Sequence, residues 1–95
     1  MAQRAAGIVS DDGVLDGEPR IEGHLIGVLQ VHEEVEDGNV SPRAFADRYG
    51  LDLAAVYRAL AYYHEHPAEM RAVRERRRER IEDARDDALT SEDVD

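Results

Sequence analysis

The sequence predicts a mainly α-helical domain, in which a short N-terminal β arm precedes a helix-turn-helix and a long helix follows it. Three observations support this fold class. Residues 8–28 hold two short apolar runs around a turn-rich centre. Residues 41–62 carry the capping, turn and packing residues of a helix-turn-helix. Residues 68–89 consist mainly of strong helix formers.

The β arm is predicted from its two apolar runs. Ile8 and Val9 form the first strand, and residues 20–22 alternate polar and apolar side chains as a half-buried strand does. The Asp, Gly and Pro residues between them favour turns. Strands this short are unstable alone, so they must lie on the helices or pair with a second subunit. Residues 1–7, which are small and polar, are expected to be disordered.

The first helix is predicted over residues 25–37. Gly38 stands where a left-handed C-terminal cap belongs. Apolar or aromatic side chains recur at steps of three and four residues, which predicts one buried face. This face comprises Leu25, Val28, Leu29, His32 and Val35.

The next two helices have clear boundaries. Ser41 is the predicted N-cap of a helix with Pro42 in its first turn, and Gly50 follows the end of that helix at residue 49. Asp52 caps the third helix, which Pro67 stops. Its predicted inward stripe is Leu53, Val56, Tyr57, Leu60 and His64. Residues 8–66 therefore form the predicted arm and helix-turn-helix domain.

The fourth helix, residues 67–89, is the predicted partner-binding segment, and residues 90–95 are expected to be a disordered tail. Residues 71–80 hold six Arg and two Glu, whereas residues 81–95 hold one Arg and seven acids. The side chains along one face of this helix are only weakly apolar, so the helix is expected either to extend into solvent or to dock on a partner. Three roles are open for its Arg run: it binds phosphate, it neutralises an acidic partner, or it pairs with nearby Glu on a solvated face. The third role is the commonest for a run of charged residues.

The amino-acid composition limits the classes of function that the chain can have. The 95 residues are enough for one domain, and with only one Phe and four Tyr its core is thin, so a dimer or partner is expected to complete it. There is no Cys for disulfides or thiol chemistry. The chain shows neither a signal peptide nor an apolar run long enough to span a bilayer, which predicts a cytoplasmic protein without membrane contact.

Charge is the least ordinary property of the chain. Its 22 Asp and Glu outnumber 12 basic residues, all of them Arg, and the net charge is −10. Such self-repulsion is relieved by concentrated salt, because the Debye length falls to about 3 Å at 1 M. This composition favours a halophilic protein over the alternative, an acidic protein from a GC-rich bacterium.

The helix-turn-helix suggests contact with DNA, although many such units mediate only protein contacts. In DNA-binding versions, outward residues of the second helix of the unit enter the major groove, and Arg is suited to guanine. The candidate DNA-contacting residues are Ser41, Arg43, Ala54, Ala55, Arg58 and Tyr62. Residues 41–62 hold three Arg and two Asp, a small electrostatic footprint, so a dimer reading two half-sites is expected.

Catalytic and metal-binding motifs are missing from the sequence pattern. The four His residues lack the i,i+4 spacing of a helical metal pair, and neither a nucleophile–base spacing nor a phosphate-cradling Gly loop occurs. We therefore expect no enzyme activity, no cofactor and no metal site, with His32 and His64 as packing residues.

Residues 7–67 resemble a family of small prokaryotic proteins, domain of unknown function 433. Its members read I-x-x-D-P-x-x-x-G-G-x-P-x-I-x-G-T-R-I-P-V and continue into an acidic helix and a helix-turn-helix. The matching residues are Ile8, Asp11, Gly17, Pro19, Ile21, Gly23, Ile26, Val28, Gly38, Tyr49, Leu51, Val56, Ala59, Leu60, Tyr62 and Tyr63. Asp12 and Asp16 replace the usual Pro and Gly, and residues 24–27 read His-Leu-Ile-Gly instead of Thr-Arg-Ile-Pro.

The resemblance implies a homeodomain-like three-helix core and the role of antitoxin in a VapBC-type pair, whose toxin is a PIN-like nuclease. A PIN-type active site is a carboxylate cluster that holds Mg²⁺, and a guanidinium placed there displaces the metal. The expected toxin-binding residues are Met70, Val73, Arg74, Arg77, Arg78 and Ile81, and the expected homodimer contacts are Ile8, Val9, Ile21 and Ile26. The alternatives are a protein-interaction adaptor that never contacts nucleic acid, and a stand-alone transcription regulator.

Overall fold

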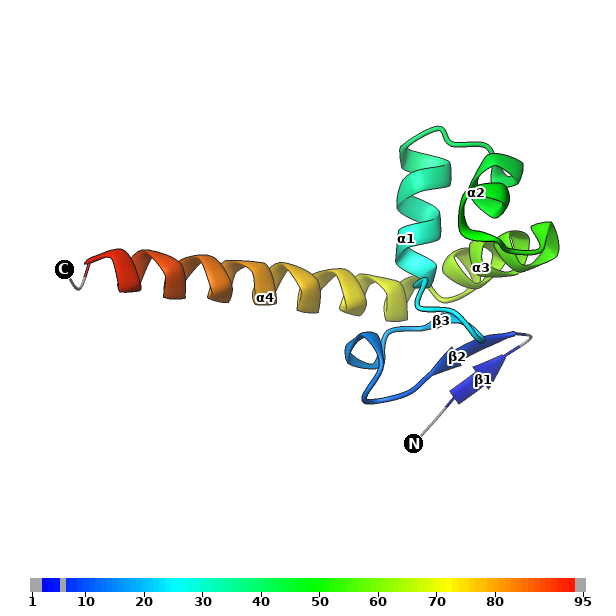
Figure 1. Cartoon of the computed structure of the whole chain (residues 1–95). Coiled ribbons are helices and arrows are strands. Elements are labelled where there is room, and N and C mark those ends of the chain that lie inside the picture. The colour runs from blue at the N-terminus through cyan, green and yellow to red at the C-terminus, as the bar shows by residue number, and fades with distance from the viewer. Residues whose placement is uncertain (1–2, 6, 94–95) are drawn as a thin grey trace.

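The computed structural model describes the backbone of residues 3–5 and 7–93 and the side chains of residues 7–87. As predicted, the chain is mainly helical. A small sheet and the helices α1, α2 and α3 form a compact body, and the long helix α4 projects from it with the C-terminus at its far end (Figure 1). Of the helices in this described part, none combines the length and the apolar character that a membrane crossing requires.

The β arm forms an antiparallel sheet in the order β1-β2-β3, comprising Gln3–Ala5, Ile8–Ser10 and Arg20–Ile21. Ile8 pairs with Ile21, which brings two of the predicted arm residues together. Strand β1 replaces the disorder expected over residues 1–7, because its backbone groups find partners along β2. The same expectation for residues 1, 2 and 6 lies outside the described residues.

The first helix begins later than predicted. Helix α1 covers Val28–His32 and continues as a π-helical turn, η2, over Glu33–Asp37. The sheet uses the backbone just before this helix: Gly27 is extended and bridges to Arg20, and Ile21 N–H donates to the Ile26 carbonyl at 2.9 Å. Leu25, expected on the buried face, is therefore outside the helix and 72% exposed.

The left-handed residue after this helix is Asn39, with φ 59°, and not Gly38, whose φ is −93°. The prediction of a left-handed Gly38 was therefore wrong. A glycine is needed at position 38 because there is no room for a side chain, and not because of the φ angle. A Cβ there would lie 2.7 Å from the Glu34 carbonyl oxygen. That carbonyl accepts a hydrogen bond from Val40 N–H at 3.0 Å, which closes the turn into the next helix.

The helix-turn-helix consists of α2 (Pro42–Tyr49) and α3 (Leu53–Glu65), with the boundaries that the sequence predicts. Ser41 Oγ accepts from Ala44 N–H at 3.1 Å, and Gly50 takes a φ of 67° in the turn. Asp52 occupies the N-cap position of α3 but makes no side-chain cap hydrogen bond.

The core lies between α3 and the elements around it. Phe45, Leu29 and Val56 are fully buried. The stripe predicted for α3 is partly wrong: Tyr57 is 54% exposed, and Ala59 and Tyr62 take inward positions instead.

Helix α4, Pro67–Asp93, is longer than predicted. Met70 and Val73 in its first turns are 2% and 1% exposed, so the start of this helix closes the core of the body. The helix includes residues 90–93, which were expected to belong to a disordered tail, because the helix-forming sequence has no break before them. Residues 94 and 95 of that expected tail lie outside the described residues.

We predict that Gly38→Ala lowers the free energy of unfolding by about 1–3 kcal/mol, as overpacking does, because the new Cβ meets a backbone carbonyl that cannot turn away. Gly13→Ala is the matched control, since a Cβ there meets no atom within 4 Å. Chemical denaturation of both variants measures the difference. Equal stability of the two variants would contradict the steric role of Gly38.

Candidate functional site

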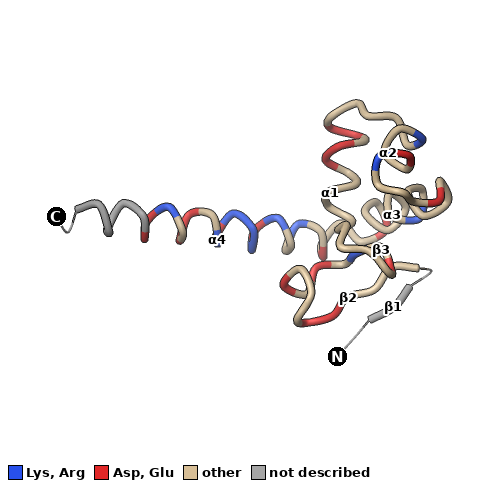
Figure 2. Tube along the Cα trace, viewed as in Figure 1, with Lys and Arg blue, Asp and Glu red and all other residues tan. Residues whose placement is uncertain are grey.

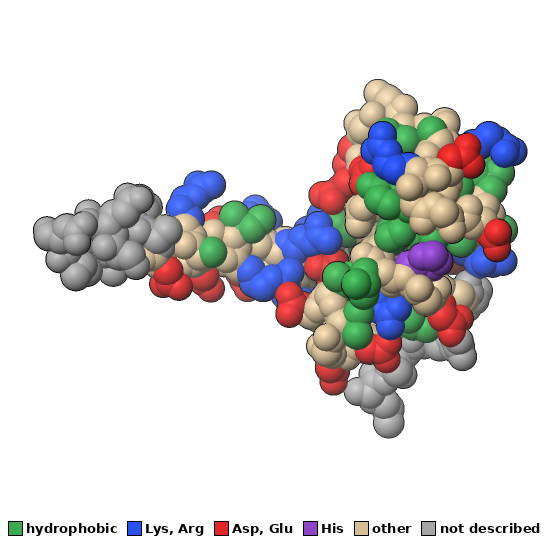
Figure 3. All heavy atoms as spheres, viewed as in Figure 1, with side chains coloured by type: hydrophobic (Ala, Val, Ile, Leu, Met, Phe, Trp, Pro, Cys, Tyr) green, Lys and Arg blue, Asp and Glu red, His purple; other side chains and the backbone are tan. Residues whose placement is uncertain are grey.

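An open groove runs between α4 and the body, with a volume of about 420 Å³. Four Arg and two Glu line it, together with apolar side chains. The lining residues are Leu29, Glu33, Arg74, Arg77, Arg78, Ile81, Glu82 and Arg85. Figure 2 shows the cations of α4 in the half nearest the body, and Figure 3 shows hydrophobic atoms beside them. In a chain of net charge −10, this groove is a basic, partly apolar surface.

One residue that lines the groove, Arg77, is held by an ion pair that sequence reasoning missed. Glu18, only 4% exposed, accepts hydrogen bonds from Arg77 Nε and Nη2 on its two oxygens, each at 3.0 Å. Arg80 Nη2 adds a contact at 3.4 Å. The hydrogen bonds that Arg77 donates to Glu18 raise the pKa of Arg77 against the opposing effect of burial. The partners are 59 residues apart, so no local pattern in the sequence indicates the pair.

The residues predicted to bind a toxin therefore divide into two groups. Met70 and Val73 are core residues, and Arg77 is bound to Glu18, so these three serve the fold of their own chain. Arg74 is exposed, with its guanidinium 5.2 Å from the centre of the Tyr63 ring and hydrogen-bonded to the Tyr63 hydroxyl. Two further residues remain at the surface of the groove: Arg78, 3.3 Å from Glu75, and Ile81, 60% exposed.

The residues predicted to contact DNA are also divided. Arg43, Ala54 and Arg58 are exposed, whereas Ala55 is half-buried and the Ser41 hydroxyl already caps α2. The outward orientation expected for Tyr62 is wrong. Tyr62 is only 8% exposed because it follows Val56 and Ala59 along the inward face of α3.

Two further contacts limit how much of the surface of α3 is open to a ligand. The Tyr62 hydroxyl donates to Glu69, and burial together with this carboxylate raises the pKa of the phenol. Arg58 lies beside the β arm: its Cδ would be 3.7 Å from a Cβ placed on Gly7. Only part of the surface of α3 is therefore open to a ligand.

The arm residues expected to form a dimer are largely inside the chain. Ile8, Ile21 and Ile26 are 2%, 4% and 8% exposed and belong to the core, whereas Val9 is half-buried. The helices of the same chain therefore provide the cover that these short strands need.

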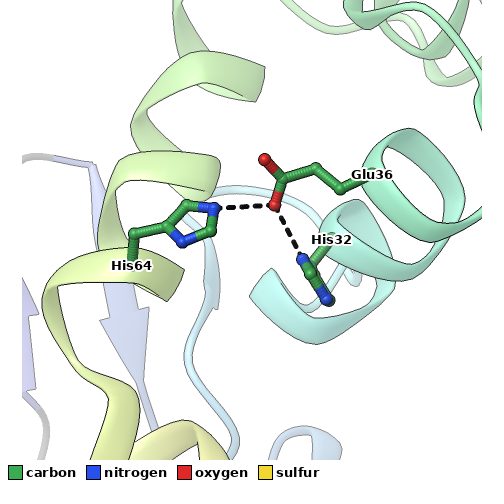
Figure 4. A group of neighbouring side chains, drawn as sticks. All are labelled: His32, Glu36 and His64. Carbon is green, nitrogen blue, oxygen red and sulfur yellow. Dashed lines mark hydrogen bonds and ion pairs between the residues drawn. The ribbon is translucent and has the colours of Figure 1, made fainter.

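A cluster of three side chains, His32, Glu36 and His64, lies between α1, η2 and the end of α3 (Figure 4). Glu36 Oε1 is 2.7 Å from His32 Nδ1 and 2.8 Å from His64 Nε2. Burial raises the pKa of Glu36, but the hydrogen bonds and charges of the two imidazoles outweigh it, so this pKa lies below its usual value. His64, expected to pack, is exposed. Spacing along the chain does not reveal this cluster, because its two imidazoles come from different helices.

We predict that Arg77→Met lowers the free energy of unfolding by about 3 kcal/mol, the lower end for a broken buried pair because Arg77 is one-third exposed. The cause is the buried charge of Glu18, which keeps only the longer contact with Arg80, so adding Glu18→Leu should restore most of the loss. Arg76→Met on the exposed face of the same helix is the control, and it should change stability by less than about 0.5 kcal/mol. Thermal and urea unfolding test this, and a double variant as unstable as Arg77→Met would contradict the assignment.

Comparison with known protein families matches residues 8–63 to one described as protein of unknown function (DUF433). The match extends from the start of β2 almost to the end of α3 and covers more than half of the 95 residues. No curated protein and no solved structure matches the chain. The chain belongs to the DUF433 family.

Proposed function

We propose that this protein is the antitoxin of a VapBC-type toxin–antitoxin pair and that it neutralises a PIN-like nuclease through the α4 groove. The observation that carries the proposal is the basic and partly apolar groove in an otherwise acidic chain. The resemblance of the arm and helix-turn-helix to their family supplies the class of partner, and the groove supplies a physical reason for binding it.

Charge complementarity favours an acidic partner. A nuclease that holds Mg²⁺ presents a carboxylate cluster, and guanidinium groups bind carboxylates with two parallel hydrogen bonds. Arg78 and Arg85 are exposed at the groove, and Arg74 is held near them by Tyr63. Arg is one of the residue types enriched in binding hot spots, and the exposed Ile81 provides an apolar anchor among these cations.

The exposure of α4 also favours a partner. Within residues 74–87 only Arg77 is even half-buried, so this part of the helix gains little from packing on its own chain. Helices of this kind derive most of their stability from packing an apolar face, and a docked partner would supply it.

We predict that Arg78→Glu combined with Ile81→Ser abolishes neutralisation of the nuclease encoded beside this chain, because charge attraction and the apolar anchor are both lost. Binding should weaken by at least ~2 kcal/mol, a factor of roughly 30. Arg76→Glu is the matched control, because Arg76 lies on the same helix outside the groove. Growth rescue on co-expression and calorimetry measure the effect.

Point variants are preferable to truncation after Pro67, which would remove the core residues Met70 and Val73. Rescue by the double variant equal to that of Arg76→Glu would contradict the role of the groove. A neighbouring gene that encodes no carboxylate-cluster nuclease would favour the adaptor function instead.

As a second element of the proposal, a homodimer represses its own operon by placing α3 against double-stranded operator DNA. The capped α2, the left-handed turn at Gly50 and the exposed Arg43 and Arg58 support this role. A dimer is needed because the basic footprint of one copy is small.

We predict that Arg58→Ala weakens binding to the DNA upstream of the gene by about 1–3 kcal/mol and relaxes its sequence preference, as loss of a base contact does. Arg43→Ala should weaken binding to all sequences alike, because Arg43 is expected to contact phosphate. Fluorescence anisotropy at two salt concentrations separates the two effects. Unchanged affinity in both variants would exclude autorepression through this face and favour the adaptor.

A further inference from the structure

We propose that His32, Glu36 and His64 form a binding site for a divalent metal ion of the zinc class, with one coordination position open to water or a ligand. The site joins η2 to the end of α3, far along the chain from each other, and it is separate from the α4 groove.

The donor atoms already converge. Glu36 Oε1 lies 2.7 Å from His32 Nδ1 and 2.8 Å from His64 Nε2, and the potential ligand atoms of all three residues lie within 4.8 Å of one another. Zinc binds His nitrogen at about 2.0–2.1 Å and carboxylate oxygen at about 2.0–2.2 Å, which places tetrahedral ligands roughly 3.3 Å apart. Small side-chain shifts are therefore enough to admit the ion.

The surroundings of His32 resemble the outer shell of a metal site. Its other ring nitrogen, Nε2, lies 3.4 Å from Asp37 Oδ2, so a carboxylate stands where it can accept that N–H while Nδ1 binds the ion. The His32 side chain is 11% exposed, and its imidazole stacks on Tyr63 with ring centres 3.7 Å apart. This packing holds the ring orientation that a ligand requires.

The backbone provides an independent observation. Glu36 lies in the π-helical turn η2, which departs from the α-helix just after His32. π-Helical turns are rare, and they occur frequently at functional sites. The turn brings Glu36 Oε1 to both imidazoles at once, which lie on different helices.

The solvent exposure of the ligands and the types of donor atom indicate which ion the site binds. The His64 and Glu36 side chains are 59% and 35% exposed, so the ion can enter from solvent. Two imidazoles and one carboxylate suit zinc and its neighbours Ni²⁺ and Co²⁺, whereas Mg²⁺ and Ca²⁺ prefer oxygen ligands. Three protein ligands leave the fourth tetrahedral position open.

Calorimetry of the untagged, EDTA-treated full chain with ZnCl₂ tests the proposal. We expect saturable binding of one Zn²⁺ per chain, a rise in the melting temperature, and neither effect with MgCl₂ at the same concentration. Co²⁺ should give the visible absorption of a tetrahedral complex. Failure to observe saturable 1:1 binding would overturn the proposal, whatever the outcome for nuclease or DNA.

Variants locate the ion. His64→Ala removes an exposed ligand and Glu36→Gln removes the anionic one, and each should weaken Zn²⁺ binding at least 100-fold, whereas Asp37→Asn should weaken it roughly 10–100-fold. His24→Ala, at a half-buried histidine that is not part of the cluster, should bind Zn²⁺ like the parent chain. Equal Zn²⁺ affinity of His64→Ala and His24→Ala would show adventitious surface binding and overturn the site.

Discussion

The carboxylate of Glu18 is buried between the β arm and α4, and the position of both elements depends on the neutralisation of its charge. A buried carboxylate is tolerated only when it is paired and hydrogen-bonded, and Arg77 provides a two-pronged partner that a lysine could not. Because Glu18 follows η1 (Leu15–Gly17) and Arg77 lies more than two turns into α4, the pair ties the arm to the helix. Met70 and Val73 complete the attachment with apolar contacts.

This attachment decides which part of α4 serves the fold and which part is available to a partner. The inward side chains up to Arg77 are buried or paired, and beyond them the helix extends from the body with its side chains exposed. The groove lies at this transition. Its cations are therefore presented on a helix whose base is fixed, so less conformational entropy is lost when a partner binds than for a free segment.

Helix α3 is the other organising element, because it contacts α1, α2, α4 and two strands of the sheet. Its C-terminal end connects the two surfaces with proposed roles. Tyr63 stacks on His32 on one side and accepts a hydrogen bond from Arg74 of α4 on the other. Tyr63 thus contacts one residue of the histidine cluster and one residue that lines the α4 groove.

The amino-acid sequence by itself determined those structural features that depend on residues close together in the chain. Ser41, Pro42 and Gly50 set the ends of α2, and the uninterrupted helix formers after Pro67 produced α4, because capping and propensity act within a few residues. The alternation at Ile8 and Ile21 likewise predicted the arm, whose side chains the fold then buries.

Only the tertiary structure decided the sites. The Glu18–Arg77 pair, the meeting of His32 with His64, and the inward position of Tyr62 depend on how distant segments pack, which spacing along the chain does not encode. Gly38 is a different case, because the carbonyl that excludes a side chain there belongs to Glu34, only four residues earlier, and depends on the path of the π-helical turn. Local rules set where α2 begins and ends, whereas long-range packing sets where α1 begins and which faces of the helices are covered, and the covered faces determine what remains for function.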